Sequence, residues 1–193
     1  IPRERPPNDE GFPCRSAGCE LRACLKWEPT MSESMYTIWG SPHSYYTGKI
    51  RAYFIKKGLP YREECVFHPR FKASILPTVR HFVVPVLETP DGRILQDTTD
   101  MIEHLEAQFP EPFVIPASPV QKAVASLLGA FGSEGLLAPG MHYRWSYRAE
   151  QEDFLCAEFG RTLQGGPSRE ARFATARQTM QYFNDFLPPL GVT

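Results

Sequence analysis

Four hydroxyl side chains lie close together between a strand-like run and the first helical pattern, and they are Ser41, Ser44, Tyr45 and Tyr46. A hydroxyl at the start of a helix can cap the helix, or it can donate a hydrogen bond to an anion near the positive end of the helix dipole. Asp97 and Thr98 mark the start of a second helical pattern, where an acidic side chain is a favoured N-cap. Both helix starts therefore carry side chains that can cap a helix or contact a ligand.

The chain has five cysteines, and three of them follow a C-x4-C-x4-C spacing: Cys14, Cys19 and Cys24. This spacing lacks the C-x2-C pair of a zinc site, and no fourth cysteine or paired histidine follows it. We therefore expect no metal. The other two, Cys65 and Cys156, are expected to be buried as small apolar side chains. So few and such scattered cysteines do not make a disulfide framework, which favours a reducing, cytoplasmic setting.

Composition excludes several classes of protein. The 193 residues include 21 Lys and Arg against 22 Asp and Glu, and no block of like charges occurs. A protein that binds mainly nucleic acid needs a clustered basic face, so nucleic acid is not an expected partner. The hydrophobic fraction of 42% is typical of a globular protein. No apolar run approaches the roughly 20 residues of a membrane span, so no membrane partner is expected.

The first 30 residues differ from the rest of the chain. They contain five prolines and only four of the residues Leu, Ile, Val and Phe. Such a segment buries too little apolar area to offset the entropy of ordering it. We therefore predict a disordered extension over residues 1–34, with the folded protein beginning near Met31. The segment also has five acidic residues and no apolar core, unlike a secretory signal or a transit peptide.

Alternation and helical spacing predict an ordered series of elements after this extension. The series is a strand at 36–39, a helix at 45–57, strands at 61–67, 83–87 and 93–96, and a helix from 98 to 109. Residues 68–82 fit no single element because prolines interrupt them. Pro90-Asp91-Gly92 predicts a turn, so the last two strands form a hairpin. The order is βαβ, an irregular link, and then ββα.

Four prolines between residues 110 and 119 predict a linker. Beyond it, helical patterns cover 121–131, 150–163 and 169–186, and no strand pattern occurs. The sequence therefore predicts an α/β domain at 35–110, a linker at 111–119 and an all-helical domain at 120–193.

This order of elements resembles that of the glutathione transferases, which join a thioredoxin-like domain to an all-α C-terminal domain. The resemblance covers about residues 36–193 and depends on three motifs, Gly40-Ser41-Pro42-His43-Ser44, Val84-Pro85-Val86-Leu87, and the segment 91–102. Relatives usually continue with further helices, so the resemblance also implies an incomplete helical domain. It further implies a homodimer, which is a family expectation only.

The activity implied by the resemblance is activation of the glutathione thiol for attack on a small electrophile, as in detoxification. A thiol with a pKa of about 8.5 is only about 3% ionised at pH 7, and a pKa lower by about 2 would ionise most of it. In the family a hydroxyl or thiol before the first helix stabilises the thiolate. Ser44 is the first candidate for this catalytic donor, and the other three hydroxyls of the loop stay open as rivals. The loop has no cysteine, which disfavours a thiol–disulfide oxidoreductase.

The resemblance also implies a glutathione-binding set, Val84, Pro85, Asp97 and Thr98. A cis peptide bond before Pro85 would free the backbone of Val84 for the cysteinyl part of glutathione. The carboxylate of Asp97 would receive the γ-glutamyl ammonium, and the helix start at Thr98 would receive its carboxylate. Alternatives are an edge-strand proline and a plain helix cap. The cation for the glycyl carboxylate is left open among Lys72, Arg80 and His81.

The second domain contains Met141-His142-Tyr143-Arg144-Trp145, a stretch that looks like one found in little-characterised transferase homologues. Its aromatic and arginine side chains would line the pocket for the electrophile or pack at the domain interface. An alternative function is a non-catalytic module that keeps the fold as a docking surface.

Overall fold

The computed structural model describes residues 35–79, 81–163, 166–184 and 187–192, and all of them belong to one compact unit. The predictions for residues 1–34 and the candidate residue Arg80 lie outside these described residues.

The first part of the described chain is an α/β fold. Its elements are β1 (Tyr36–Gly40), α1 (Tyr45–Lys57), β2 (Tyr61–Cys65), the π-helical turn η1 (Phe71–Ile75), the short 3-10 turn η2 (Leu76–Thr78), β3 (Val86–Glu88), β4 (Ile94–Gln96) and α2 (Thr98–Gln108). The sheet order is β2-β1-β3-β4, with β1 and β2 parallel and the other two pairs antiparallel. The predicted thioredoxin-like topology is confirmed.

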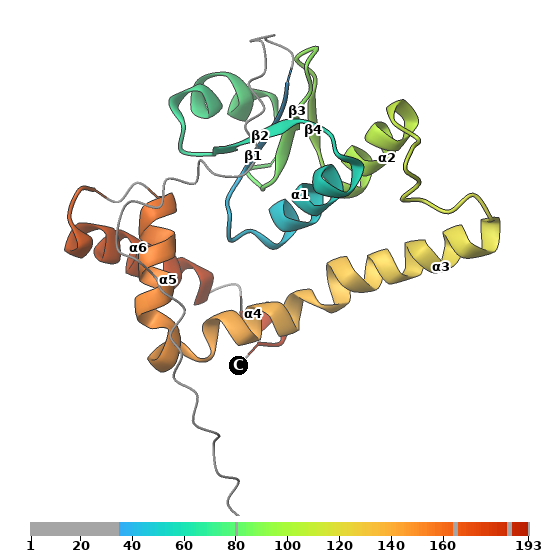
Figure 1. Cartoon of the computed structure of the whole chain (residues 1–193). Coiled ribbons are helices and arrows are strands. Elements are labelled where there is room, and N and C mark those ends of the chain that lie inside the picture. The colour runs from blue at the N-terminus through green and yellow to red at the C-terminus, as the bar shows by residue number, and fades with distance from the viewer. Residues whose placement is uncertain (1–34, 80, 164–165, 185–186, 193) are drawn as a thin grey trace, which may run out of the picture. The chain divides into compact units, whose positions relative to one another are not determined.

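Alternate residues of the strands face two separate cores. Ile38 and Leu87 are fully buried against α1 and α2, which cover one face of the sheet (Figure 1). Trp39 and Val86, their neighbours in sequence, pack on the opposite face against the η1 turn. This division follows from the period of two residues in a strand, which sends successive side chains to opposite faces. The buried sheet is a rigid base for the loops that leave its ends.

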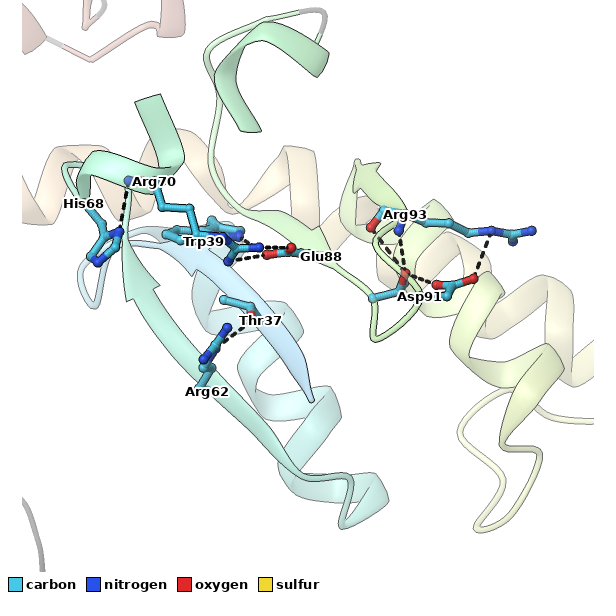
Figure 2. Close-up of polar contacts among 9 residues, drawn as sticks. Thr37, Trp39, Arg62, His68, Arg70, Glu88, Asp91 and Arg93 are labelled. Carbon is cyan, nitrogen blue, oxygen red and sulfur yellow. Dashed lines mark hydrogen bonds and ion pairs between the residues drawn. The ribbon is translucent and has the colours of Figure 1, made fainter. Parts of the chain in front are cut away.

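The second sheet face also carries a polar cluster (Figure 2). The indole N–H of Trp39 donates to the carboxylate of Glu88 at 3.0 Å, and Arg70 donates to both oxygens of the same carboxylate. The Arg70 guanidinium lies 5.4 Å from the centroid of the Trp39 ring. Pairing and stacking satisfy all three side chains, so we assign this cluster to structure.

Strand ends differ from the prediction by a few residues, and each difference has a physical cause. The third strand begins at Val86 and not at residue 83, because Pro85 has no N–H to donate to a neighbouring strand. The second strand ends at Cys65 because its partner β1 ends at Gly40, which is paired with Cys65. The predicted turn is confirmed: the N–H of Gly92 donates to the carbonyl of Thr89, with φ of +82° at Gly92.

Every described element after residue 118 is a helix, as predicted. These elements are α3 (Pro119–Ala130), η3 (Phe131–Gly135), α4 (Leu137–Trp145), α5 (Arg148–Thr162), α6 (Arg169–Asn184) and η4 (Pro188–Leu190). Their core includes Trp145, Phe159 and Phe173. The sequence prediction did not include helix α4, which contains Pro139. Pro139 is tolerated because it lies in the first turn, where backbone N–H groups have no partner within the helix.

Helix α3 carries an exposed apolar surface that we call the α3 stripe. It consists of Val120, Val124, Leu127 and Leu128 of α3 and continues to Phe131 at the start of η3, and the exposed fractions run from 51% to 73%. No residue of α3 itself is buried. None of the helices within the described ranges is both long and apolar enough to cross a membrane.

Candidate functional site

The loop between β1 and α1 is held close to the helix that follows it. A side chain at Gly40 would collide with the side chain of Thr47, because a Cβ built there lies 2.6 Å from Thr47. Glycine at this position therefore allows the chain to turn directly from the strand into the helix. Ser44 is the N-cap of α1, and its Oγ accepts a hydrogen bond from the N–H of Thr47 at 3.2 Å. Ser44 therefore has the helix-cap role that was the alternative to its role as the thiolate donor.

The cap leaves the hydroxyl proton of Ser44 available. The hydroxyl is the acceptor in its bond with Thr47, and its proton has no acceptor among the residues that the structure describes. The N-terminus of α1 adds the positive end of a helix dipole, and this helix has no acidic residue in its first turn. Ser44 is thus arranged to donate to an anion.

The two rival tyrosines already use their protons. Tyr45 donates its hydroxyl to the carbonyl of Gly132, and Tyr46 donates to the carbonyl of Ser133 at 2.9 Å. Burial raises the pKa of Tyr46, and the nearby Glu134 carboxylate raises it further. Both rings therefore anchor the loop to η3, which weakens their case as donors to a thiolate.

A pocket of about 260 Å³ brings together the four residues of the predicted glutathione-binding set, Val84, Pro85, Asp97 and Thr98. They come from the segment before β3 and from the start of α2. The other lining side chains include Tyr46 and Lys49 of α1 and Glu134 of η3. The peptide bond between Val84 and Pro85 is cis, as the resemblance implies.

Asp97 has an unusual backbone conformation. Its φ is +70°, and it is the one non-glycine residue with positive φ in the described part of the chain. Its carboxylate accepts a hydrogen bond from the N–H of Thr99 at 2.7 Å, which caps α2 as predicted. A carboxylate can accept about four hydrogen bonds, so most of its capacity remains. The side chain is exposed, whereas Thr98 beside it is buried. Rare backbone conformations of this kind often occur at ligand-binding sites.

Lys49 is the cation that sequence reasoning missed. It lines the pocket, and its ammonium donates to the Ser133 hydroxyl at 3.1 Å. The expected candidates Lys72 and His81 do not line the pocket. The signal for Lys49 in the sequence was its position in the first turns of α1, the helix that Ser44 caps. Helical spacing alone did not show that this side of α1 meets the start of α2.

A second pocket of about 220 Å³ adjoins the first, since Tyr46 and Val84 line both. Ser41, His43 and Ser44 contribute polar atoms to it. Leu137, Met141, Arg144 and Phe159 form the wall from the helical part. Together the two pockets reach the size range of small-ligand sites, roughly 300–1,000 Å³. Arg144 thus lies at the pocket, whereas Trp145 is buried in the helical core.

His43 is held in this second pocket. Its Nε2 lies 3.1 Å from the hydroxyl of Thr162, and its ring packs on Phe159 with centroids 5.2 Å apart. Burial lowers the pKa of His43 below its usual value, although Glu158 partly opposes the shift. The ring is therefore uncharged at neutral pH, and its 3.8 Å contact with Glu158 is not an ion pair there.

A larger cavity of about 610 Å³ lies at α5 and α6, away from these residues. Its arginines have partners in the protein. Arg161 pairs with Glu158, Arg169 approaches Asp153 at 3.6 Å, and Arg172 donates to the carbonyl of Pro167 at 2.9 Å. This cavity does not contain an array of free cations that would mark a binding site.

Residues 39–113 match the family described as glutathione S-transferase, N-terminal domain. No curated protein sequence matches the chain. A glutathione S-transferase from Rhodospirillum rubrum F11 has a similar crystal structure, with 20% identity and a TM-score of 0.50 over 77% of this chain and 64% of that one.

Glutathione transferase Omega 3C from Trametes versicolor has the same identity and TM-score, 20% and 0.50, over 66% of this chain and 55% of its own. The chain therefore spans less than two thirds of the length of either structure. At such identities the likeness shows the fold alone, and the sequence match shows the family of the matched domain. Residues 39–113 of this chain are therefore a glutathione S-transferase N-terminal domain.

Proposed function

We propose that this chain binds glutathione in the 260 Å³ pocket and activates its thiol for attack on a small electrophile held in the adjoining pocket. The observation that carries the proposal is that the N-termini of α1 and α2 and the Val84–Pro85 peptide bond all lie at these two adjoining pockets. Ser44 caps one helix and Asp97 caps the other.

Each part of the tripeptide has a partner of suitable chemistry. The Asp97 carboxylate would receive the γ-glutamyl ammonium, and the N–H groups at the start of α2 would receive the adjacent carboxylate. The backbone of Val84 would pair with the cysteinyl unit. Lys49 would attract the glycyl carboxylate. Lys49 would thereby take the role of the cation that the sequence left open among Lys72, Arg80 and His81. Ser44 would then donate to the sulfur.

The reaction we propose is a conjugation, as in the detoxification of electrophiles. No metal takes part in it. We also propose a cytoplasmic location, since a reducing compartment keeps glutathione as a thiol, and the described cysteines Cys65 and Cys156 are free thiols.

Titration calorimetry with glutathione, followed by a conjugation assay, tests the proposal on the full chain. Binding together with conjugation above the uncatalysed rate supports the enzyme. Binding without conjugation supports the alternative, a non-catalytic module that keeps the fold. A folded sample that does not bind glutathione contradicts the proposal.

Replacing Asp97 with asparagine is expected to weaken glutathione binding about tenfold. Asparagine keeps an oxygen for the N–H of Thr99 but lacks the charge that pairs with an ammonium, and charge-assisted bonds exceed neutral ones by about 1.4 kcal/mol. Asp100→Asn is the matched control, because it removes the same charge from an exposed position in the same helix turn, outside the pocket. Equal affinities of the two variants would remove Asp97 from the site.

We further propose that the chain forms a homodimer through the α3 stripe. Five large apolar side chains, more than half exposed along α3 and the start of η3, exceed the scattered apolar residues typical of a monomer surface. A two-fold axis would let each stripe pack on its copy. Light scattering after size exclusion is expected to give twice the mass of the chain, and Leu127→Glu with Leu128→Glu is expected to give a monomer. A monomeric wild type would contradict this proposal.

A further inference from the structure

Arg144 is an arginine without a charged partner in the pocket that contains Ser44. Its side chain is half-buried among the apolar wall residues Leu137, Met141 and Phe159. Other arginines of the described chain form close ion pairs, such as Arg51 with Glu63 at 2.7 Å. No described carboxylate lies within 4.0 Å of the Arg144 guanidinium.

The surroundings of Arg144 do not neutralise it. Burial alone lowers the pKa of Arg144, with no carboxylate acting against that effect. Its neighbour His43 is uncharged at neutral pH, and Glu158 is engaged by Arg161. A guanidinium stays protonated in proteins, so this pocket contains a positive charge that is partly removed from water. Such a charge gains most from a bound anion.

We propose that Arg144 selects electrophiles that carry a carboxylate, which its guanidinium binds while the thiolate attacks. This inference rests on the proposed function, because it assigns a substrate class to the second pocket. The glutathione pocket has its own cation in Lys49, so the tripeptide's carboxylates do not require Arg144. The planar fork of a guanidinium matches a carboxylate through two parallel hydrogen bonds.

The test compares two chlorinated aromatic substrates that differ in charge. In both, the glutathione thiolate attacks the ring carbon that carries chlorine, a C–S bond forms, the C–Cl bond breaks, and chloride leaves with the electron pair. The thiol proton passes to the buffer. The substrates are 4-chloro-3,5-dinitrobenzoate, which is an anion, and 4-chloro-3,5-dinitrobenzamide, which is neutral. The readout is the ratio of kcat/KM for the benzoate to kcat/KM for the benzamide.

Arg144→Met is expected to lower this ratio about 10- to 100-fold, the usual effect of losing a charge-assisted pair. Arg144→Lys keeps the charge without the fork and is expected to retain part of the preference. Arg93→Met is the control, because Arg93 is an exposed arginine in the turn between β3 and β4. It is expected to leave the ratio unchanged. Circular dichroism of each variant verifies the fold.

The outcomes separate this inference from the proposed function. If the wild type conjugates both substrates but Arg144→Met leaves the ratio unchanged, the inference is wrong and the transferase activity stands. If Arg144→Met slows both substrates equally and raises the pKa of the bound thiol, Arg144 acts on the sulfur and the inference is again wrong. If the folded wild type does not bind glutathione and conjugates neither substrate, both the inference and the proposed function are wrong.

Discussion

Replacing Ser44 with alanine is expected to lower kcat/KM for glutathione conjugation about 100-fold. The hydroxyl is the candidate donor to the thiolate, and removing one preorganised donor to a reactive anion typically costs about 10² to 10³ in rate. A pKa shift of about 2 on the thiol corresponds to about 2.7 kcal/mol, so the two estimates agree. In the variant, the pKa of bound glutathione is expected to return toward about 8.5. The ultraviolet absorbance of the thiolate, followed through a pH titration, measures that pKa.

Alanine also removes the cap of α1, because Ser44 accepts from the N–H of Thr47. Loss of such a cap costs about 1 kcal/mol, so a stability change must be separated from the chemical one. Ser44→Gly separates them, since glycine at an N-cap costs only about a few tenths of a kcal/mol and has no side-chain donor. We expect it to keep nearly wild-type stability and lose activity like alanine, while Ser44→Thr keeps both.

Wild-type rates in Ser44→Gly would transfer the donor role to another hydroxyl of the loop. Ser41 lines the same pocket and would be the next candidate. Tyr45→Phe and Tyr46→Phe are weaker candidates, because both hydroxyls donate to backbone carbonyls of η3.

Local sequence patterns predicted most elements of this fold because their signals lie within a few residues. Ser44 and Gly58 bound α1, and both caps have the expected conformation, with φ of +66° at Gly58. The ends of strands were less predictable, since a strand ends where its partner ends. Cys65 ends β2 for that reason, a fact that no local pattern contains. Helix α4 was not predicted, and it contains Pro139, whose effect depends on its position within the helix.

The candidate site shows the same limit. Val84, Pro85, Asp97 and Thr98 were named from a family resemblance, and all four line one pocket. Their roles toward glutathione stay predictions. Lys49 was assigned no role, and Arg144 was left open between the electrophile pocket and the domain interface, because the role of each depends on which distant surfaces meet. Residues 49 and 134 line the first pocket, and residues 44 and 144 line the second. The periodicity of a single helix does not indicate which distant residues lie in the same pocket.

The second large effect concerns stability, in a buried network that joins the far ends of α1 and α2. The Lys57 side chain is fully buried, and its ammonium lies 2.5 Å from a carboxylate oxygen of Glu106. It also donates to the carbonyls of Phe109 at 2.6 Å and Pro112 at 2.9 Å. Tyr53 donates to Glu106 at 2.7 Å. Burial opposes ionisation of Glu106, but hydrogen bonds from Lys57 and Tyr53 outweigh it and lower the pKa of that carboxyl.

Lys57→Met is expected to lower the free energy of unfolding by about 3 kcal/mol, because it leaves a buried carboxylate and two carbonyls without their cation. For a unit of this size the melting temperature should fall by roughly 6–12 °C. Thermal unfolding measured by circular dichroism tests this. Lys56→Met is the matched control, since Lys56 is the exposed neighbour on the same helix and should change stability by less than about 0.5 kcal/mol. Equal melting temperatures of the two variants would show that the network contributes nothing.

A second substitution separates the loss of the ion pair from the loss of packing. Adding Glu106→Gln to Lys57→Met removes the charge that the first change left unpaired, while the glutamine oxygen still accepts from Tyr53. The double variant should therefore be less destabilised than the sum of the two single variants, and the difference measures their coupling. Ser44 and Asp97 begin the two helices whose ends this network joins. A helix is a stiff element, so the network that links the C-terminal ends of α1 and α2 limits how far their N-termini can move apart. It thereby limits how far the two candidate ligand contacts, Ser44 and Asp97, can separate.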